Sequence, residues 1–411
     1  MTANRPPLLA GVRIIESSML GPGFLTTFLS DLGADVIKVE PPQGDYIRQM
    51  TWPIVEGTSL LHLHCHRGKR SITLDLKTEE GLAVYRDLVA GADAVVEAMR
   101  PGSLAKLGLG YDDLVEVNPK IVFCTLSGYG ASGPYRDLPS HGIVYDTWAG
   151  LIPPEVDDDG FTRIPAMPNI GINVGPMLGA LGLLAGVLRA RDTGTGCQME
   201  LAQSDAAAYL DWYRVETELA YLRPEDEVTG NASDDYERRA PGLAGMRDGV
   251  RYQIYESADG HVIFMASEQA FWRNFCEGCD RMDLFERWPG SKYADHAKGN
   301  LELQAELRDI FRTRTSAEWI AFADEHNTTI GPVNNAESLR DDPQFQHRFP
   351  LHPASRLGAD QLPLPVFVEG EELPVPTKAP EVGEHNDEVL HEVLGYDDDR
   401  VAQLRDGGAL G

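Results

Sequence analysis

The sequence contains 411 residues, of which 42% are hydrophobic and 24% are charged, and this composition is typical of a soluble globular protein with a buried core. Its 64 acidic residues outnumber 36 basic ones, so the formal charge at pH 7 is −28. Such a field repels nucleic acids and anionic membranes, which argues against a general binder of either, and an anionic ligand requires a local basic pocket.

The cysteines are five in number and scattered along the chain, at positions 65, 124, 197, 276 and 279. This pattern indicates a reducing cytoplasm rather than a disulfide framework. The one C-x-x-C pair, Cys276 and Cys279, has no second pair, so we expect no metal site there. The N-terminal stretch "MTANRPPLLAG" lacks the apolar segment of a signal peptide, and we expect a cytoplasmic protein.

The first half of the chain alternates between short apolar runs and helical patterns. We expect helices at 21–33 and 78–92, and strands at 11–18, 34–42, 71–76, 93–99 and 120–130. Strands separated by helices predict an α/β fold with a parallel, doubly wound, Rossmann-like sheet. Ligands of such sheets bind at the carboxyl ends of the strands.

The second half changes in character. Residues 175–196 form a helical pattern so apolar that we expect it to run through the core. A hairpin around Asp259-Gly260 and helices from 268 to 325 predict a smaller α+β domain. The domain boundaries we expect are 1–222 for the large domain, 223–250 for a linker, 251–328 for the small domain and 329–411 for a return segment that completes the large domain.

The stretch "LHLHCHRGKRSITLDLKT", residues 61–78, concentrates basic residues on an acidic chain. Arginine and lysine at this density can bind phosphate through charge-assisted hydrogen bonds, although a solvated loop that offsets nearby acids would have the same composition. The histidines at 62, 64 and 66 alternate, which predicts that they share one face of a strand.

Several blocks of the sequence together resemble the family III CoA-transferases, the group that includes formyl-CoA transferase, carnitine CoA-transferase and α-methylacyl-CoA racemase. The blocks are "LLAGVRIIESSMLGPG", "LSDLGADVIKVEPPQGDYIR", "HRGKRSITLDLKTEEG", "VVEAMRPGSLAKLGLGYDDL", "SGYGASGPY", "RDTGTGCQMELAQSD", "IGPVNNAESLRDDP" and "GEHNDEVLHEVLG". They span nearly the whole chain in the family's order.

The resemblance implies a Rossmann-like large domain and a small domain, with two chains interlocked as a dimer. It implies coenzyme A or acyl-CoA and carboxylic acids as substrates, and no metal. A nucleotide site is implied by similarity, with Leu74 and Met99 at the adenine and Lys106 as a cation. The basic residues that we assign to CoA are Arg67, Lys69, Arg70, Arg100 and Lys106.

The resemblance also places His141, nine residues before Gly150, in the slot that a histidine fills in racemases of the family. A neutral imidazole there can move the α-proton of an acyl-CoA or polarise the thioester carbonyl. A histidine that only caps a loop is the alternative. The family's histidine is usually followed by Asp, and here Gly142 follows it.

The chain departs from the family at the nucleophile. Transferases use an Asp that forms a mixed anhydride with the acyl group, and the expected position is about 171–173. No Asp or Glu lies between Gly171 and Leu188, and Asn173 is the nearest polar side chain. An amide can neither form an anhydride nor carry a proton reversibly. Asp146, five residues after His141, is the nearest substitute carboxylate.

Three functions therefore remain open. The first is CoA transfer between carboxylic acids with a substitute carboxylate, and the second is a racemase-, isomerase- or lyase-like reaction through His141. The third is a CoA-binding subunit that pairs with an Asp-bearing homologue instead of forming a homodimer. An NAD-dependent oxidoreductase is disfavoured, because "SSMLGPGFL" after the first strand lacks the G-x-G-x-x-G spacing.

Overall fold

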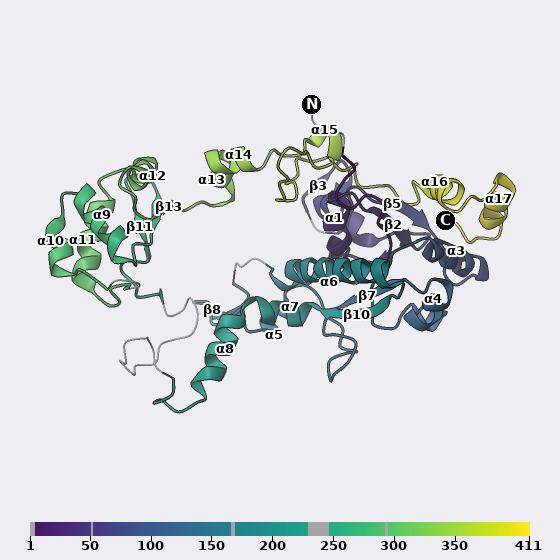
Figure 1. Ribbon diagram of the computed structural model, residues 1–411, viewed down its shortest axis with the longest axis horizontal. Coiled ribbons are helices and arrows are strands. Elements are labelled where there is room, and N and C mark those ends of the chain that lie inside the picture. The colour runs from purple at the N-terminus through teal and green to yellow at the C-terminus, as the bar shows by residue number, and fades with distance from the viewer. Residues whose placement is uncertain (1–4, 51, 166–168, 229–245, 292–294) are drawn as a thin grey trace. The chain divides into compact units, whose positions relative to one another are not determined.

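The computed structural model describes residues 5–50, 52–165, 169–228, 246–291 and 295–411. The chain divides into two compact units (Figure 1). Unit 1 comprises Met1–Asp211 and Arg348–Gly411, and unit 2 comprises Trp212–His347.

These boundaries differ from the expected ones at both ends of unit 2. Strand β13 (Ile330–Pro332) pairs with β12 (His261–Phe264), so the segment expected to return at 329 first completes the sheet of unit 2. Helix α8 (Trp212–Tyr221) also belongs to unit 2 rather than to the large domain. Within the expected linker, residues 229–245 lie outside the described part of the chain.

Unit 1 is built on a six-stranded sheet with the order β10-β7-β6-β1-β2-β5, in which every neighbouring pair is parallel. The order runs outward from β1 in both directions, which is the doubly wound topology that the sequence predicts. The strands are β1 (Arg13–Ser18), β2 (Asp35–Glu40), β5 (Arg70–Thr73), β6 (Ala94–Ala98), β7 (Val122–Ser127) and β10 (Cys197–Ala202).

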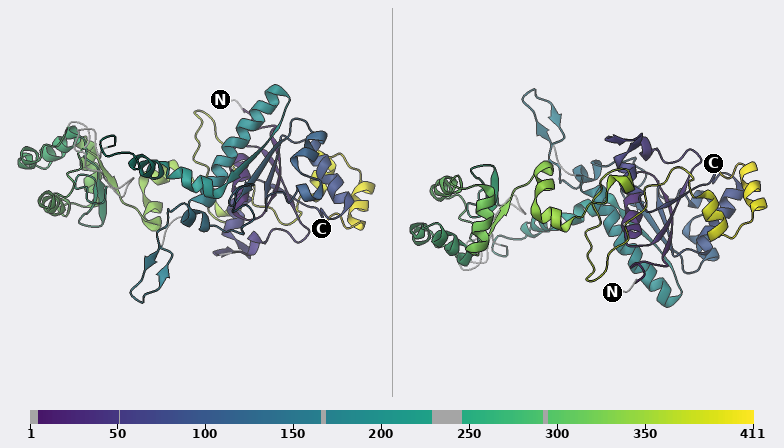
Figure 2. Two further views of the ribbon diagram at one scale, coloured as in Figure 1. Left: turned by 90° about the horizontal axis from the view of Figure 1, so that it is seen from below. Right: turned by 90° about the horizontal axis from the view of Figure 1, so that it is seen from above.

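Helices cover both faces of this sheet (Figures 1 and 2). One face packs on α1 (Phe24–Asp31) and α6 (Gly171–Thr193) through a core that includes Ile14, Val96 and Leu183. The opposite face packs on α3 (Glu79–Ala90), α4 (Tyr111–Val117) and α17 (Asp398–Asp406). The C-terminal segment thus belongs to the core of unit 1.

Helix α6 covers a face of the sheet and does not run through the core as expected. It is long and apolar enough to cross a membrane by length and composition, yet one side of it packs on the sheet. The other side exposes Met177, Leu181 and Leu188 by 54%, 67% and 70%. Since exposed apolar patches mark interaction surfaces, this side is a candidate interface.

Unit 2 contains the predicted hairpin, formed by β11 (Gln253–Glu256) and β12, with β13 as its third strand. Its core is aromatic, and Phe264, Phe275 and Trp319 are fully buried in it. The helices around this core are α9 (Gln269–Gly278), α10 (Met282–Arg287), α11 (Leu301–Phe311) and α12 (Ser316–Glu325). Helices α13 (Ala336–Asp341) and α14 (Pro343–Arg348) follow β13, and α14 ends at the residue where the chain re-enters unit 1.

Short elements complete unit 1. Hairpin β8–β9 extends from its body (Figure 2). The short strands are β3 (Ile54–Val55), β4 (Thr58–Ser59), β8 (Glu155–Val156) and β9 (Thr162–Arg163). The short helices are α2 (Leu60–Cys65), α5 (Val144–Trp148), α7 (Gln203–Leu210), α15 (Ala354–Leu357) and α16 (Asn386–Glu388). Single turns are η1 (Gly21–Gly23), η2 (Tyr46–Gln49), η3 (Ala105–Leu107) and η5 (Val389–Val393).

A buried ion cluster lies within unit 1. The Glu16 carboxylate lies 2.8 Å from Lys69 Nζ and 3.3 Å from Lys38 Nζ, and all three side chains are fully buried. Burial by itself would raise the pKa of Glu16, but the two ammonium groups outweigh burial and lower it to about 2. The cluster is therefore charged, and each member depends on the others.

Replacing Lys69 by Met should destabilise the protein by about 3–5 kcal/mol, because the change leaves a buried carboxylate undercompensated. Urea unfolding at pH 7 measures this loss. Lys77→Met is the matched control at an exposed position, and it should change the free energy of unfolding by less than about 0.5 kcal/mol. Equal small effects at both positions would contradict the assigned role of the cluster.

Candidate functional site

A cavity of about 320 Å³ opens at the carboxyl ends of β1, β6 and β7, where a doubly wound sheet binds its ligands. Three chain segments form most of its walls, each following one of these strands. Its lining includes residues 19–22 after β1, 98–101 at the end of β6, and 126–129 with 136–142 after β7. Tyr46, Tyr145, Ile172 and Gln203 complete it.

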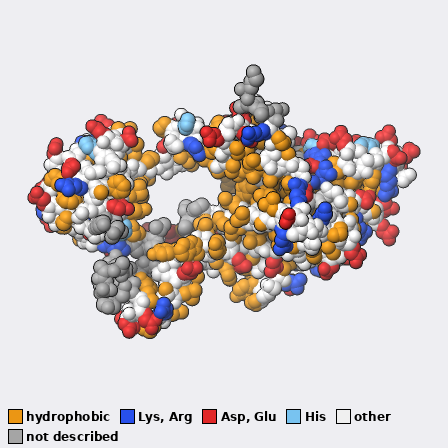
Figure 3. All heavy atoms as spheres, in the orientation of Figure 1, with side chains coloured by type: hydrophobic (Ala, Val, Ile, Leu, Met, Phe, Trp, Pro, Cys, Tyr) orange, Lys and Arg blue, Asp and Glu red, His pale blue; other side chains and the backbone are white. Residues whose placement is uncertain are grey.

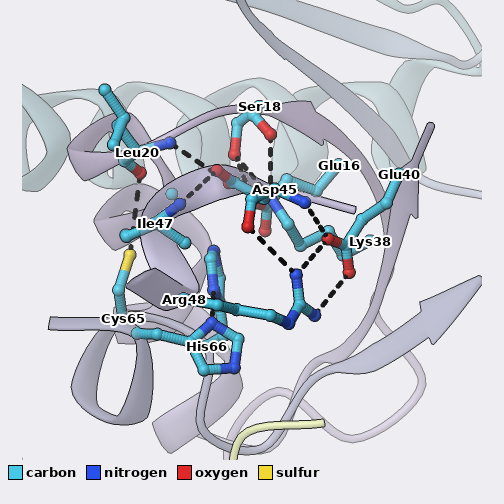
Figure 4. A network of polar contacts seen from close by, with 12 residues as sticks. Glu16, Ser18, Leu20, Lys38, Glu40, Asp45, Ile47, Arg48, Cys65 and His66 are labelled. Atoms are coloured by element: carbon cyan, nitrogen blue, oxygen red, sulfur yellow. Dashed lines mark hydrogen bonds and ion pairs between the residues drawn. The ribbon is translucent and has the colours of Figure 1, made fainter. Parts of the chain in front are cut away.

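The wall after β1 contains a strained residue. Leu20 has a φ of 61° and a ψ of −150°, a region that residues other than glycine rarely adopt and that costs roughly 1–3 kcal/mol. Its amide donates to the Asp45 carboxylate at 3.2 Å, and its carbonyl accepts from the amide of Gly23. The Cys65 thiol points at the same carbonyl from 3.8 Å (Figure 4).

The buried ion cluster supports this wall. Lys38 Nζ donates to the Ser18 carbonyl at 2.8 Å and lies 3.2 Å from Asp45, which in turn accepts from Leu20 (Figure 4). Asp45 is itself fixed through its own amide, which donates to Glu40 at 2.8 Å. Burial and the neighbouring carboxylates act on Lys38 in opposite directions, and its pKa is raised because Glu16 and Asp45 outweigh burial.

The first two of the three histidines lie on a helix and the third ends it, so the expectation that they alternate along a strand is wrong. Ser59 caps α2 by accepting the amide of His62, and residues four apart on a helix share a face. Accordingly His62 Nδ1 and His66 Nδ1 lie 2.8 Å apart, whereas His64 accepts from Arg67 at 3.1 Å.

The hydrogen bonds of His62 assign its proton. Its Nε2 lies 3.3 Å from the Pro380 carbonyl oxygen, which can only accept, so Nε2 carries the hydrogen and Nδ1 accepts from His66. This arrangement requires the His62 ring to be neutral. Burial, reinforced by the charge of Arg48, lowers the pKa of His62 to about 3, and burial with Lys38 nearby lowers the pKa of His66 well below its usual value.

The structure places the basic run of residues 67–70 inside the protein, which corrects its interpretation as a ligand-facing loop. Lys69 is part of the buried cluster, and Arg67 makes a bidentate ion pair with Asp31 at 3.0 and 2.6 Å. Arg70 pairs with Asp35 and Glu388 at the amino end of β5. These partners precede the run by more than 30 residues or follow it by more than 300, so local sequence could not reveal the pairing.

The wall after β6 holds two of the predicted CoA residues, Met99 and Arg100. Lys106 lies nearby in sequence on η3 and is exposed, although it does not line the cavity. Leu74, expected at the adenine, is instead fully buried in the core on the α3 face of the sheet.

The wall after β7 is a loop that folds back over its own strand. Gly128 permits this, because a β-carbon there would lie 2.0 Å from Ser140 Oγ. Ser140 pairs with the Tyr145 hydroxyl at 3.0 Å, and burial raises the pKa of that tyrosine. His141 is exposed on this loop and lines the cavity. Gly142 follows with a φ of +33°, which explains a glycine where the family usually has Asp.

The other two predicted catalytic residues do not line the cavity. Asp146 is fully buried, and its oxygens accept the amides of Gly171 at 2.8 Å and Ile170 at 3.2 Å, so it caps the start of α6. Its carboxylate is thus occupied and unavailable as a nucleophile. Asn173 is exposed on the first turn of α6 and donates to the Asn169 carbonyl at 2.5 Å.

Sequence reasoning missed three polar residues of the lining, Arg136, Asp137 and Gln203. Asp137 supplies the one carboxylate among the described lining residues. Within the described part of the chain, neither Arg136 nor Arg100 forms an ion pair, in contrast to the paired basic run. Gln203 directly follows β10, and because the sequence pattern does not predict that strand, the position of Gln203 gave no signal.

Comparison with known proteins defines the class. The family model of CoA-transferase family III matches residues 9–386, and the chain belongs to this family. It is an enzyme of the CoA-transferase type, acting on CoA thioesters and carboxylic acids.

Two relatives illustrate the similarity. Human succinyl-CoA:glutarate CoA-transferase is 28% identical, and the alignment covers 98% of this chain and 90% of the relative. Succinyl-CoA–L-malate CoA-transferase beta subunit of Chloroflexus aurantiacus is 29% identical, with 97% and 96% covered.

Solved structures agree with this fold. A CaiB/BaiF family protein from Brucella suis has a TM-score of 0.74 at 25% identity and covers 95% of this chain and 100% of its own. Rv3272 from Mycobacterium tuberculosis has a TM-score of 0.75 at 26% identity, with 93% and 99% covered.

The neutral histidine pair predicts acid sensitivity. The folded pKa of His62, about 3, lies below its ordinary value of 6.5, so the unfolded chain binds the proton first as pH falls. The stability that His62 contributes is complete above pH 6.5 and is lost as pH falls toward 3. Urea titrations from pH 7 to 4 should give a slope that His62→Gln reduces by up to about 1.4 kcal/mol per pH unit.

His347→Gln is the control for that experiment, since His347 is exposed. An unchanged slope in His62→Gln would show that folding does not lower the pKa of His62.

Proposed function

We propose that this chain transfers CoA between dicarboxylic acids in the cavity at the carboxyl ends of β1, β6 and β7. The observation that carries the proposal is the cavity lining, which combines two arginines with the carboxylate of Asp137 and the imidazole of His141. We assign the nucleotide end of CoA to the segment after β6, where Met99 contacts the adenine and Arg100 and Lys106 bind phosphate.

The dicarboxylic acyl group is supported by the relatives. Their names specify succinyl-CoA with glutarate, D-citramalate, L-malate or mesaconate. A dicarboxylate keeps one free carboxylate after the other has formed the thioester, and that group needs a cation. Arg136 lines the same cavity as His141, and its guanidinium can bind a carboxylate in bidentate fashion.

Asp137 is the carboxylate we assign to the chemistry. One of its oxygens attacks the thioester carbonyl carbon, the C–S bond breaks, and CoA leaves as the thiolate, which gives a mixed anhydride. The thiolate then attacks the aspartyl carbonyl and releases the first acid as its carboxylate. The second acid reverses both steps, so it leaves as its CoA thioester and Asp137 is regenerated.

His141 can assist by donating a hydrogen bond to the thioester oxygen. Used instead as a base at the α-carbon, it would support the racemase or isomerase reaction. A CoA-binding subunit is the second candidate function, favoured by Asn173 at the position expected for the family's nucleophile and by a relative named as a beta subunit. Such a subunit would act with an Asp-bearing homologue.

We infer a dimeric, cytoplasmic protein, either a homodimer of the interlocked type or a heteromer. The exposed apolar side of α6 supports assembly, and Figure 3 shows hydrophobic side chains gathered where α6 and α7 lie, whereas charged side chains dominate over α3, α4 and α17. All five cysteines are free thiols, which supports a reducing compartment.

Replacing Arg100 or Lys106 by Ala should weaken CoA binding by about 1–3 kcal/mol, because each change removes a charge-assisted hydrogen bond to phosphate. Isothermal titration calorimetry with CoA measures the effect. Lys120→Ala is the matched control, since Lys120 is exposed and precedes β7 at the opposite edge of the sheet. If all three variants lose affinity equally, the effect is one of net charge and the assignment fails.

Incubation with succinyl-CoA followed by hydroxylamine should label Asp137, because hydroxylamine traps an aspartyl anhydride or thioester. Peptide mass spectrometry locates the adduct, and Asp137→Asn should abolish it. An adduct at Asp146 or within residues 165–180 would contradict the assignment. Labelling that requires an added Asp-bearing homologue would identify the chain as a partner subunit.

Asn173→Asp is the complementary variant. A carboxylate on the first turn of α6 is compatible with the helix dipole, so the variant should fold as well as the wild type. If position 173 lies at the reacting thioester, this variant should gain a second adduct, which peptide mass spectrometry would locate on the first turn of α6.

A further inference from the structure

Gln203 is a buried polar side chain without a partner. It is 3% exposed and begins α7 directly after β10, and it lines the cavity. Its Oε1 is buried and accepts no hydrogen bond, and in the described part of the chain its Nε2 donates none. Buried polar groups are nearly always paired, and an unpaired one is unfavourable, so a ligand is the expected partner.

The surrounding helices fix Gln203 in the wall. A β-carbon on Gly175 would lie 3.0 Å from Gln203 Cγ, and one on Gly171 would lie 3.1 Å from its carbonyl oxygen. These two glycines, four apart on α6, therefore allow the first turn of α6 to pack directly against Gln203. This is the turn that carries Asn173, at the position expected for the family's nucleophile.

The chemistry of the carboxamide selects its partner. Oε1 requires a donor, whereas carboxylates and thioester oxygens only accept at neutral pH. A secondary amide has both an N–H donor and a C=O acceptor, so one of the two can hydrogen-bond to the carboxamide whichever way the carboxamide is turned. The pantetheine arm of CoA contains two secondary amides, and the one nearer the sulfur is separated from it by two carbons.

We propose that Gln203 binds the pantetheine amide next to the sulfur and thereby sets the position of the thioester along the cavity. The proposal rests on the proposed function, since it assumes that CoA occupies this cavity. Because the nucleotide is assigned to the end of β6, and Gln203 follows β10 beyond β7, the CoA arm crosses the carboxyl end of β7. Gln203 is thus a positioning and binding residue rather than a nucleophile.

The test compares CoA with adenosine 3′,5′-bisphosphate, which lacks the pantetheine arm. In Gln203→Met, a nearly isosteric change, the Kd for CoA should rise at least about tenfold, whereas the Kd for the bisphosphate should change less than about twofold. The melting temperature should stay equal or rise, because an unpaired buried acceptor has been removed. Gln198→Met, the same change at an exposed position of β10, should alter none of these values.

An unchanged CoA affinity, or an equal loss for both ligands, would overturn the proposal. Gln203→Asn keeps the carboxamide but shortens the side chain by one methylene, so it should also lower the affinity for CoA and not that for the bisphosphate. This variant provides the test if Gln203→Met does not fold. Failure of the proposed function is distinguishable, because the wild type would then bind neither ligand. If the wild type binds CoA and both variants match it, only the role of Gln203 is wrong.

Discussion

The carboxylate of Glu16 lies in the interior of unit 1 with no exposure to water, and the fold around the cavity depends on how its charge is compensated. Lys38 comes from β2, and Lys69 comes from the residue directly before β5. Lys38 also reaches the Ser18 carbonyl and Asp45, and Asp45 holds the amide of the strained Leu20. A single buried charge therefore links three neighbouring strands to the shape of one cavity wall.

The pattern of ion pairs explains how an acidic chain can bind an anionic ligand such as CoA. Many of its arginines and lysines are occupied in internal ion pairs, including the dense run at 67–70. Arg100 and Arg136, which line the cavity, form no ion pair among the described residues and are available to an anion. The local charge at the cavity thus differs from the net charge of the chain, and the pairing pattern rather than the composition decides where an anion binds.

The sequence predicts those parts of the fold that depend on local pattern. Five of the six strands of the large sheet are short apolar runs, and the hairpin at Asp259-Gly260 carries its own turn signal. The sequence does not predict β10, because this strand is not a short apolar run: it lies at the edge of the sheet and alternates between half-buried and exposed residues. The histidines at 62, 64 and 66 recur every second residue, which is the period of a strand, yet His62 and His64 lie on helix α2. The sequence signal for this helix is Ser59, which caps it.

The site is predictable only in part, for a related reason. His141, Met99 and Arg100 lie on segments that follow strands and carry the family resemblance, and the structure brings them to one cavity. Asp146 looks like a free carboxylate in sequence, but its partners are amides 24 and 25 residues further along the chain. Gln203 could not be singled out because its lack of a partner is a property of packing, which no local pattern records.

We propose that CoA lies across the carboxyl ends of β6 and β7 in this cavity. A crystal structure of the protein with CoA bound is the decisive test. It should show adenine beside Met99, phosphate at Arg100, and the sulfur within about 4 Å of the side chains of Asp137 or His141, a reach that a reacting group requires. A nucleotide bound along the surface of the 67–70 run, or a sulfur outside the cavity, would contradict it.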